Sequence, residues 1–117
     1  MNRRELIRLM VLNAICDDYE NVDQVILRDV AKNGAKLGLA VERSDIVAAL
    51  ADLIKDGLAK AYFLSTTEPA KEIEGMPSVE VVERNFKTYF YITKKGMDLH
   101  RSDDTWWPFD DESKPLV

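Results

Sequence analysis

Residues 44–64 read SDIVAALADLIKDGLAKAYFL, a helical pattern that gives way to a strand pattern at a glycine. In the first part, apolar side chains recur three and four residues apart, which is typical of a helix with one buried side. After the glycine, a Tyr and a Phe follow each other in a short apolar run, which favours a strand. We therefore predict a helix over residues 43–56 and a strand over residues 58–64.

The end of this predicted helix is better marked than its start. Gly57 follows the last periodic residue, where helices commonly end in a left-handed conformation. At the start, Ser44 can act as the N-cap, or Glu42 can form a capping box with Asp45 three residues later. The residue pattern leaves both starts open.

A first helix is predicted over residues 3–18, which contain strong helix formers and neither Gly nor Pro. Its apolar residues surround most of the circumference, so it must be covered on more than one side. One interpretation is a homodimer in which Leu9, Val11 and Ile15 face a second subunit. The other interpretation is a central helix wrapped by the rest of its own chain.

Between these two helices we predict a short strand over residues 24–26 and a second helix over residues 27–37. Gly34 lies inside this helix, where it costs about 1 kcal/mol relative to alanine. We expect the close approach of another helix to explain it. Gly38 is in the position of a C-terminal cap.

Downstream of the central stretch, the residues predict a polar loop over 65–78 and a strand over 87–93, KTYFYIT. Residues 79–82 fit either a strand extension or a short helix. A last short helix follows through Met97, and an acidic tail carrying aromatic residues occupies 105–117.

The predicted order is helix, short strand, helix, helix, strand, long loop, strand, helix. This order predicts one mainly α (α+β) domain over residues 1–104. A helix pair with a tight turn followed by a two-stranded antiparallel hairpin is a helix-turn-helix with a β-wing.

Two stretches resemble bacterial winged-helix regulators, with the MarR-like and PadR-like groups nearest. Residues 44–64 resemble their third helix and first wing strand, and residues 89–100, YFYITKKGMDLH, resemble their second wing strand. The matching positions are Ala49, Leu50, Leu53, Gly57, Leu58, Ile92, Thr93, Lys95 and Gly96. The resemblance implies a winged-helix fold, with Gly96 at the turn between the last strand and helix, and favours DNA binding; a fold alone does not establish a function.

In such proteins the third helix enters the major groove of DNA. With the apolar stripe turned inward, the outward positions of this helix are Ser44, Asp45, Ala48, Ala49, Asp52, Lys55 and Asp56. Of these, we expect Ser44, Asp45, Ala48 and Asp52 to face bases. Three carboxylates on this side argue against DNA, because phosphates repel them.

Positive side chains that could contact DNA phosphates are found elsewhere in the chain. They are Arg28, Lys32, Lys36, Arg43, Lys87, Lys94 and Lys95. The first three repeat every four residues along one helix and fit either a phosphate-binding ridge or an ordinary solvated helix face.

Two functions therefore compete. The first is a DNA-binding protein like a transcriptional regulator, and the second is a winged helix that binds a protein partner through its acidic third helix or wing. The net charge of −5 weakens the first hypothesis without excluding it, since local patches matter more than totals.

Other classes are disfavoured. One cysteine, Cys16, and one histidine, His100, exclude an internal disulfide and argue against a zinc site. We expect no enzymatic activity, cofactor or metal, with Cys16 a packing residue and His100 a surface residue. The N-terminal apolar stretch is interrupted by charged residues, so we expect a mature cytoplasmic protein and not a signal peptide.

The aromatic tail is expected to pack on the domain or on a second subunit. Its apolar residues are Trp106, Trp107 and Phe109, which would expose much apolar surface if left in water.

Overall fold

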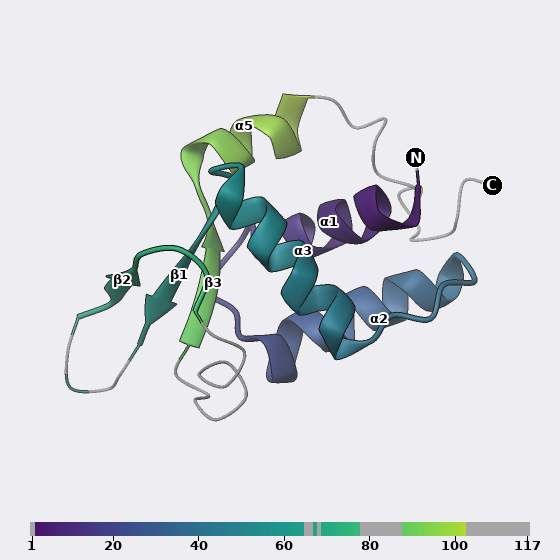
Figure 1. Cartoon of the computed structure of the whole chain (residues 1–117), viewed down its shortest axis with the longest axis horizontal. Coiled ribbons are helices and arrows are strands. Elements are labelled where there is room, and N and C mark those ends of the chain that lie inside the picture. The colour runs from purple at the N-terminus through teal and green to yellow at the C-terminus, as the bar shows by residue number, and fades with distance from the viewer. Residues whose placement is uncertain (1, 65–66, 68, 78–87, 103–117) are drawn as a thin grey trace.

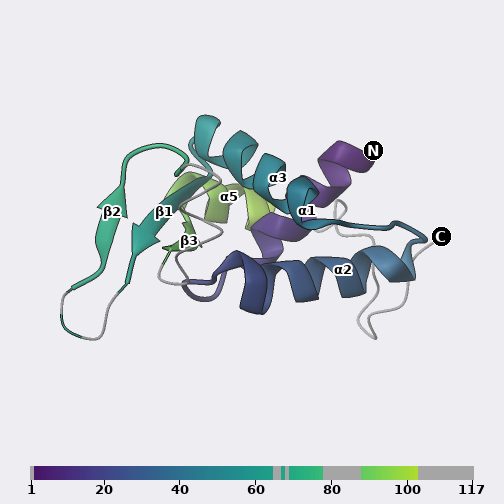
Figure 2. The ribbon, with the colours of Figure 1, turned by 60° about the horizontal axis from the view of Figure 1, so that its bottom comes forward.

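Three helices and a small sheet form most of the described chain. The structure, a computed structural model, describes residues 2–64, 67, 69–77 and 88–102. In Figure 1 the sheet lies at one side and α1, α2 and α3 extend away from it. Figure 2 shows α2 running below α1 and α3. The predicted α+β class is confirmed at this level.

The first helix, α1 (Arg3–Ala14), begins at Asn2, whose side chain accepts from the Glu5 N–H at 2.8 Å. Its last residue is Ala14, four residues earlier than predicted, and Ile15 is its C-cap. Val11 and Ile15 are completely buried within the single chain. The apolar circumference of α1 is therefore explained by its central position, since α2, α3 and α5 (Lys94–Ser102) all contact it.

The predicted strand over residues 24–26 is wrong. These residues belong to a short π-helical turn, η1 (Val22–Ile26), which runs directly into α2 (Leu27–Lys36). The Asn21 side chain accepts from the Gln24 N–H at 2.8 Å and so starts helical structure there. The extended pairing occurs just before it, where Glu20 and Phe90 exchange backbone hydrogen bonds of 3.0 and 2.8 Å.

The predicted reason for Gly34 is also wrong. A Cβ at this position would lie 2.8 Å from Val41 Cγ2 and 3.3 Å from the Leu39 carbonyl oxygen. The close neighbour is therefore the connection that follows α2 and not another helix. Gly38 adopts φ 73° after α2, as its predicted role as a cap requires.

The third helix, α3 (Arg43–Lys55), resolves the two candidate starts. Glu42 is the N-cap, and its N–H donates to Asp45 Oδ2 at 2.9 Å, as expected for a capping box. Gly57, with φ 76°, follows the helix as predicted. The buried side of α3 is formed by Ile46, Ala49, Leu50 and Leu53.

The sheet is antiparallel with the order β2-β1-β3. The predicted strands are confirmed as β1 (Ala59–Phe63) and β3 (Thr88–Ile92), paired from Ala59 opposite Ile92 to Phe63 opposite Thr88. β2 (Lys71–Ile73) lies inside the predicted loop over 65–78, so that prediction is wrong in part. A strand of three residues carries too few alternations to be predicted from its pattern.

The last helix, α5, starts earlier than predicted because Thr93 caps it. Thr93 Oγ1 accepts from the Gly96 N–H at 3.0 Å. Gly96 lies inside the helix and not in the expected turn, and a Cβ there would overlap the Leu58 carbonyl oxygen. No helix among the described residues is both long and apolar enough to cross a membrane.

Candidate functional site

The side of α3 opposite the core carries mostly small and apolar residues. At about 100° per residue, a single stripe along α3 holds Ser44, Val47, Ala48, Ala51 and Lys55. We call these five residues the exposed stripe. Ser44, Ala48 and Lys55 are exposed and the other two are half-buried. Nothing in this stripe is acidic.

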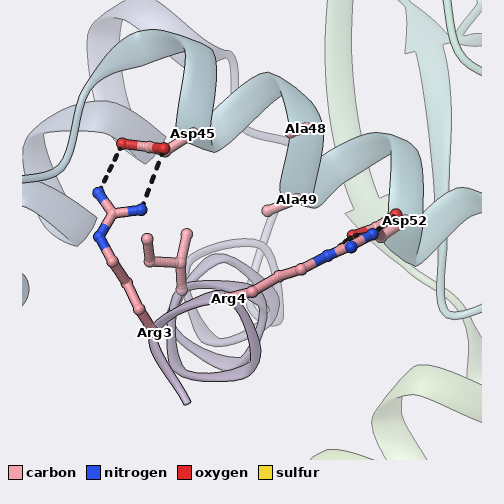
Figure 3. Close-up of a pocket in the computed structure, with 7 residues that line it drawn as sticks. Arg3, Arg4, Asp45, Ala48, Ala49 and Asp52 are labelled. Atoms are coloured by element: carbon pink, nitrogen blue, oxygen red, sulfur yellow. Dashed lines mark hydrogen bonds and ion pairs between the residues drawn. The ribbon is translucent and has the colours of Figure 1, made fainter.

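The three predicted outward carboxylates are paired with arginines of α1. Arg3 binds Asp45 at 2.9 Å, Arg4 binds Asp52 at 2.7 Å and Arg8 binds Asp56 at 2.9 Å. We call these three ion pairs the arginine–aspartate ladder. Figure 3 shows Arg3 and Arg4 reaching from α1 to Asp45 and Asp52 on α3. The carboxylates are therefore turned toward α1, to one side of the exposed stripe.

Sequence reasoning overlooked these partners, although a signal was present. Arg4 and Arg8 are four residues apart, as are Asp52 and Asp56, so two helices running side by side can pair both. Ala49, which was expected to face outward, is buried at 4% exposure under the ladder.

The arginine–aspartate ladder shifts the pKa values of Asp45 and Arg3. A hydrogen bond from Arg3 is the main reason that the pKa of Asp45 is lowered, and the backbone N–H of Glu42 adds to it. The same hydrogen bond raises the pKa of Arg3. Asp45 is thus held in its charged, paired form.

A cavity of about 430 Å³ opens between the Arg3–Asp45 and Arg4–Asp52 pairs (Figure 3). Its lining residues are Arg3, Arg4, Ile7, Asp45, Ala48, Ala49 and Asp52. Both arginines already bind carboxylates, so the cavity presents no unneutralised charge to a ligand.

A second hollow, also of about 430 Å³, lies along the exposed stripe. Its walls come from α3 and from the segment after β2, and are formed by Arg43, Ser44, Val47, Ala48, Ala51, Met76 and Pro77. We call it the α3 groove. It is mostly apolar, and the sequence did not indicate it because Met76 and Pro77 fall in the predicted loop.

The structure separates the predicted phosphate contacts into two groups. Lys32 and Lys36 line a hollow together with residues of α1 and with Asp17, Glu20 and Asp29. Arg28, one turn earlier, lies 3.7 Å from Asp29. This basic ridge is therefore mixed with carboxylates on the α1 side of α2. None of the residues lining that hollow also lines the α3 groove.

The second group lies at the two ends of α3. Arg43 at the start binds Asp23 with nitrogen–oxygen distances of 2.8 and 3.3 Å. At the other end, Lys55 and Lys95 line one hollow, and Lys95 donates to the Asp56 carbonyl at 2.9 Å. Lys94 is exposed beside it. Lys87 lies outside the described residues.

The residues expected at a dimer contact are mostly accounted for within one chain. Val11 and Ile15 are in the core and Leu9 is half-buried, so their burial needs no second subunit. Trp106, Trp107 and Phe109, together with residues 79–82, lie outside the described residues.

Cys16 and His100 are both held by neighbours. Cys16 is buried, as expected, with its Sγ 3.6 Å from Asp17 Oδ1. His100, which was expected at the surface, is half-buried, and its Nε2 lies 2.9 Å from Asn13 Oδ1. Among residues that the structure describes, no three His, Cys, Asp or Glu side chains gather as metal ligands would.

Comparisons with known protein families, with curated proteins and with solved structures found no match to this chain.

Proposed function

We propose that this chain is a winged-helix protein that binds duplex DNA, in the manner of a transcriptional regulator, through the exposed stripe of α3. The order of elements supports the proposal. Two helices joined by a short connection precede a hairpin-like pair of strands, and the Glu20–Phe90 bridge adds a short extended segment beside β3. This order fits a helix-turn-helix with a wing.

The observation that carries the proposal is the arginine–aspartate ladder. The main argument against DNA was the acidic character of the third helix. Each of its carboxylates from Asp45 to Asp56 has an arginine within 2.9 Å. A neutralised carboxylate turned to the side repels phosphate far less than a free one on the contact surface.

The exposed stripe is suited to close approach. Ser44, Ala48 and Ala51 are small, so the helix backbone can lie deep in a major groove. A serine hydroxyl can bond to any base edge, and alanine methyl groups can contact the methyl group of thymine. Lys55, Lys94 and Lys95 at the C-terminal end are placed to contact phosphates. We assign the phosphate contacts to these three lysines in preference to the ridge on α2.

The test introduces a negative or a positive charge at one position of the exposed stripe, Ala48. We expect wild-type protein to bind random duplex DNA at low salt and to weaken steeply as salt increases. Ala48→Glu should weaken binding at least about tenfold, and Ala48→Lys should preserve or strengthen it. Ala35→Glu is the matched control, because Ala35 is an exposed alanine on α2 that lines neither hollow.

Equal effects of Ala48→Glu and Ala35→Glu would show that α3 is not the contact surface. Absence of binding even at low salt would reject DNA as the ligand.

A protein partner is the second candidate, favoured by the apolar α3 groove. An apolar side chain of a partner could insert between Val47, Ala51 and Met76. Titration with a leucine-rich helical peptide, followed by amide NMR signals, tests this. Shifts confined to Val47, Ala48 and Ala51, with no DNA binding at low salt, would favour the protein partner. Unchanged spectra would reject the groove as a peptide site.

A further inference from the structure

All four tyrosines of the chain lie on one face of the sheet. Tyr62 of β1 is opposite Tyr89 of β3, and Tyr91 is opposite Lys60, so the register places these side chains together. Their strand neighbours Ala61, Phe90 and Ile92 point to the other face and are buried. The tyrosines themselves are half-buried.

Tyr19 joins this face from the segment after α1. Its ring centroid lies 5.0 Å from that of Tyr62, edge to face, and 4.9 Å from that of Tyr91. The Glu20–Phe90 backbone bridge fixes the chain beside Tyr19 against β3. Four aromatic rings from three segments therefore form one surface, which we call the tyrosine face.

The charges on the tyrosine face are balanced. Lys60 of β1 binds Glu72 of β2 at 2.9 Å, and their side chains are 49% and 53% exposed. Glu72 is opposite Tyr62 in the register, so both charges are on the same side as the tyrosines. Burial raises the pKa of Tyr62.

We propose that a second copy of this chain binds here, with the tyrosine faces of two copies packed against each other about a two-fold axis. Tyrosine is enriched where proteins bind proteins, because its ring buries a large area while its hydroxyl stays hydrogen-bonded. The proposal is independent of DNA binding by α3.

The charges on the tyrosine face favour a second copy of the chain as the binding partner. A nucleic acid or an anionic membrane would need an excess of cations, and among the described residues of this face one lysine is matched by one glutamate. A surface with one charge of each sign is complementary to itself. A two-fold axis can place Lys60 across from Glu72 of the partner subunit and repeat the same contact on the other side.

Charge reversal tests this geometry. The oligomeric state is measured by sedimentation equilibrium on the full chain from low micromolar to near-millimolar concentration, with circular dichroism to confirm folding. Lys60→Glu should raise the dimer dissociation constant at least about tenfold, because it breaks the pair with Glu72 and creates like charges within each face and across the axis. The double variant Lys60→Glu, Glu72→Lys should restore it to within about threefold, since both signs are exchanged.

A ring test complements the charge test. Tyr91→Glu should weaken the dimer at least about tenfold, whereas Tyr91→Phe, which keeps the ring, should change it less than about threefold. A wild-type chain that stays monomeric at every concentration would overturn the proposal. So would a dimer that neither Lys60→Glu nor Tyr91→Glu weakens, and a double variant as weak as Lys60→Glu would overturn the two-fold pairing.

Discussion

Arg4 of α1 donates hydrogen bonds to both carboxylate oxygens of Asp52 on α3, with distances of 2.7 and 2.9 Å from one guanidinium nitrogen. Its Nε adds a third hydrogen bond at 3.0 Å. The two residues are 48 positions apart in the chain. This contact lowers the negative charge that α3 presents to any ligand, because the Asp52 carboxylate is one half of an ion pair.

Removing Arg4 should therefore affect DNA binding more than stability. The Arg4 side chain is 75% exposed, and exposed ion pairs contribute about 0–1 kcal/mol to folding. We expect Arg4→Ala to leave the midpoint of thermal unfolding nearly unchanged. Its affinity for duplex DNA should fall several-fold, because Asp52 becomes an unpaired charge beside the exposed stripe. Fluorescence anisotropy with labelled duplex at low salt measures this.

The matched control is Asp52→Asn. It removes the charge that Arg4 neutralises, so DNA binding should be preserved, and the double variant Arg4→Ala, Asp52→Asn should recover most of the affinity lost by Arg4→Ala. If the double variant binds as weakly as Arg4→Ala, the arginine itself contacts DNA, and the ladder does not act by neutralising α3.

The acid dependence of stability should carry opposite contributions from two carboxyl groups. The pKa of Asp45 is lowered in the folded state, so its stabilising effect is present above 3.8, the ordinary value, and is lost as pH falls through the folded pKa. The pKa of Glu20 is raised, chiefly by burial, so its contribution is present below 4.5 and is lost as pH rises through the folded pKa.

Urea unfolding measured between about pH 3 and 7 tests both signs. Asp45→Asn should make the free energy of unfolding less dependent on pH at the acid end, even though it also weakens the start of α3. Glu20→Gln should remove a loss of stability that occurs as pH rises above 4.5. Changes of the same sign in the two variants would contradict the assigned causes.

Features set by residues close in the sequence could mostly be predicted, whereas features set by contacts between distant residues could not. The limits of α3, β1 and β3 are set by local signals, such as the Glu42–Asp45 capping box and Gly57, and they could be predicted. The direction of Asp45 and Asp52 depends on arginines more than 40 residues away. A pattern within one helix cannot show which side faces a neighbouring helix, so the acidic surface was overestimated.

The wrongly predicted strand over residues 24–26 has a local cause. Gln24, Val25 and Ile26 suit a strand by composition, but the preceding Asn21 accepts from the Gln24 N–H and begins helical turns. The α3 groove and the tyrosine face were missed because they depend on long-range contacts. Each gathers residues from segments that the sequence separates, as Tyr19 and Tyr91 illustrate.

Asn21 and Asn2 provide a direct comparison of a buried and an exposed helix cap. Each side-chain oxygen accepts a backbone N–H at 2.8 Å, but Asn21 is only 4% exposed and Asn2 is exposed. Loss of an exposed cap costs about 1 kcal/mol. At Asn21 the loss should be larger, because the bond to the Gln24 N–H is part-buried and water replaces it less readily. We expect Asn21→Ala to be clearly more destabilising than Asn2→Ala in urea unfolding. Equal losses would mean that water reaches the start of η1.

Gly96 should be the least replaceable helical glycine in the described chain. A Cβ there would overlap the Leu58 carbonyl oxygen and approach Ile92 Cγ1 to 2.7 Å. At Gly34 the nearest atom is the end of a side chain, Val41 Cγ2, which can move more readily than backbone. Alanine gains about 1 kcal/mol of helix propensity at either position. That gain offsets much of the strain at Gly34 but little of it at Gly96.

We therefore expect Gly96→Ala to lower the free energy of unfolding by about 2–4 kcal/mol and Gly34→Ala to lower it by less than about 1 kcal/mol. Asp98→Ala, at an exposed position of α5, should be nearly neutral and shows that the helix itself tolerates alanine. A Gly96→Ala protein as stable as Asp98→Ala would show that α5 does not pack tightly against Leu58, between α3 and β1. In that case the position of α5 would not be fixed, and Lys94 and Lys95 would lose the support on which the proposed phosphate contacts depend.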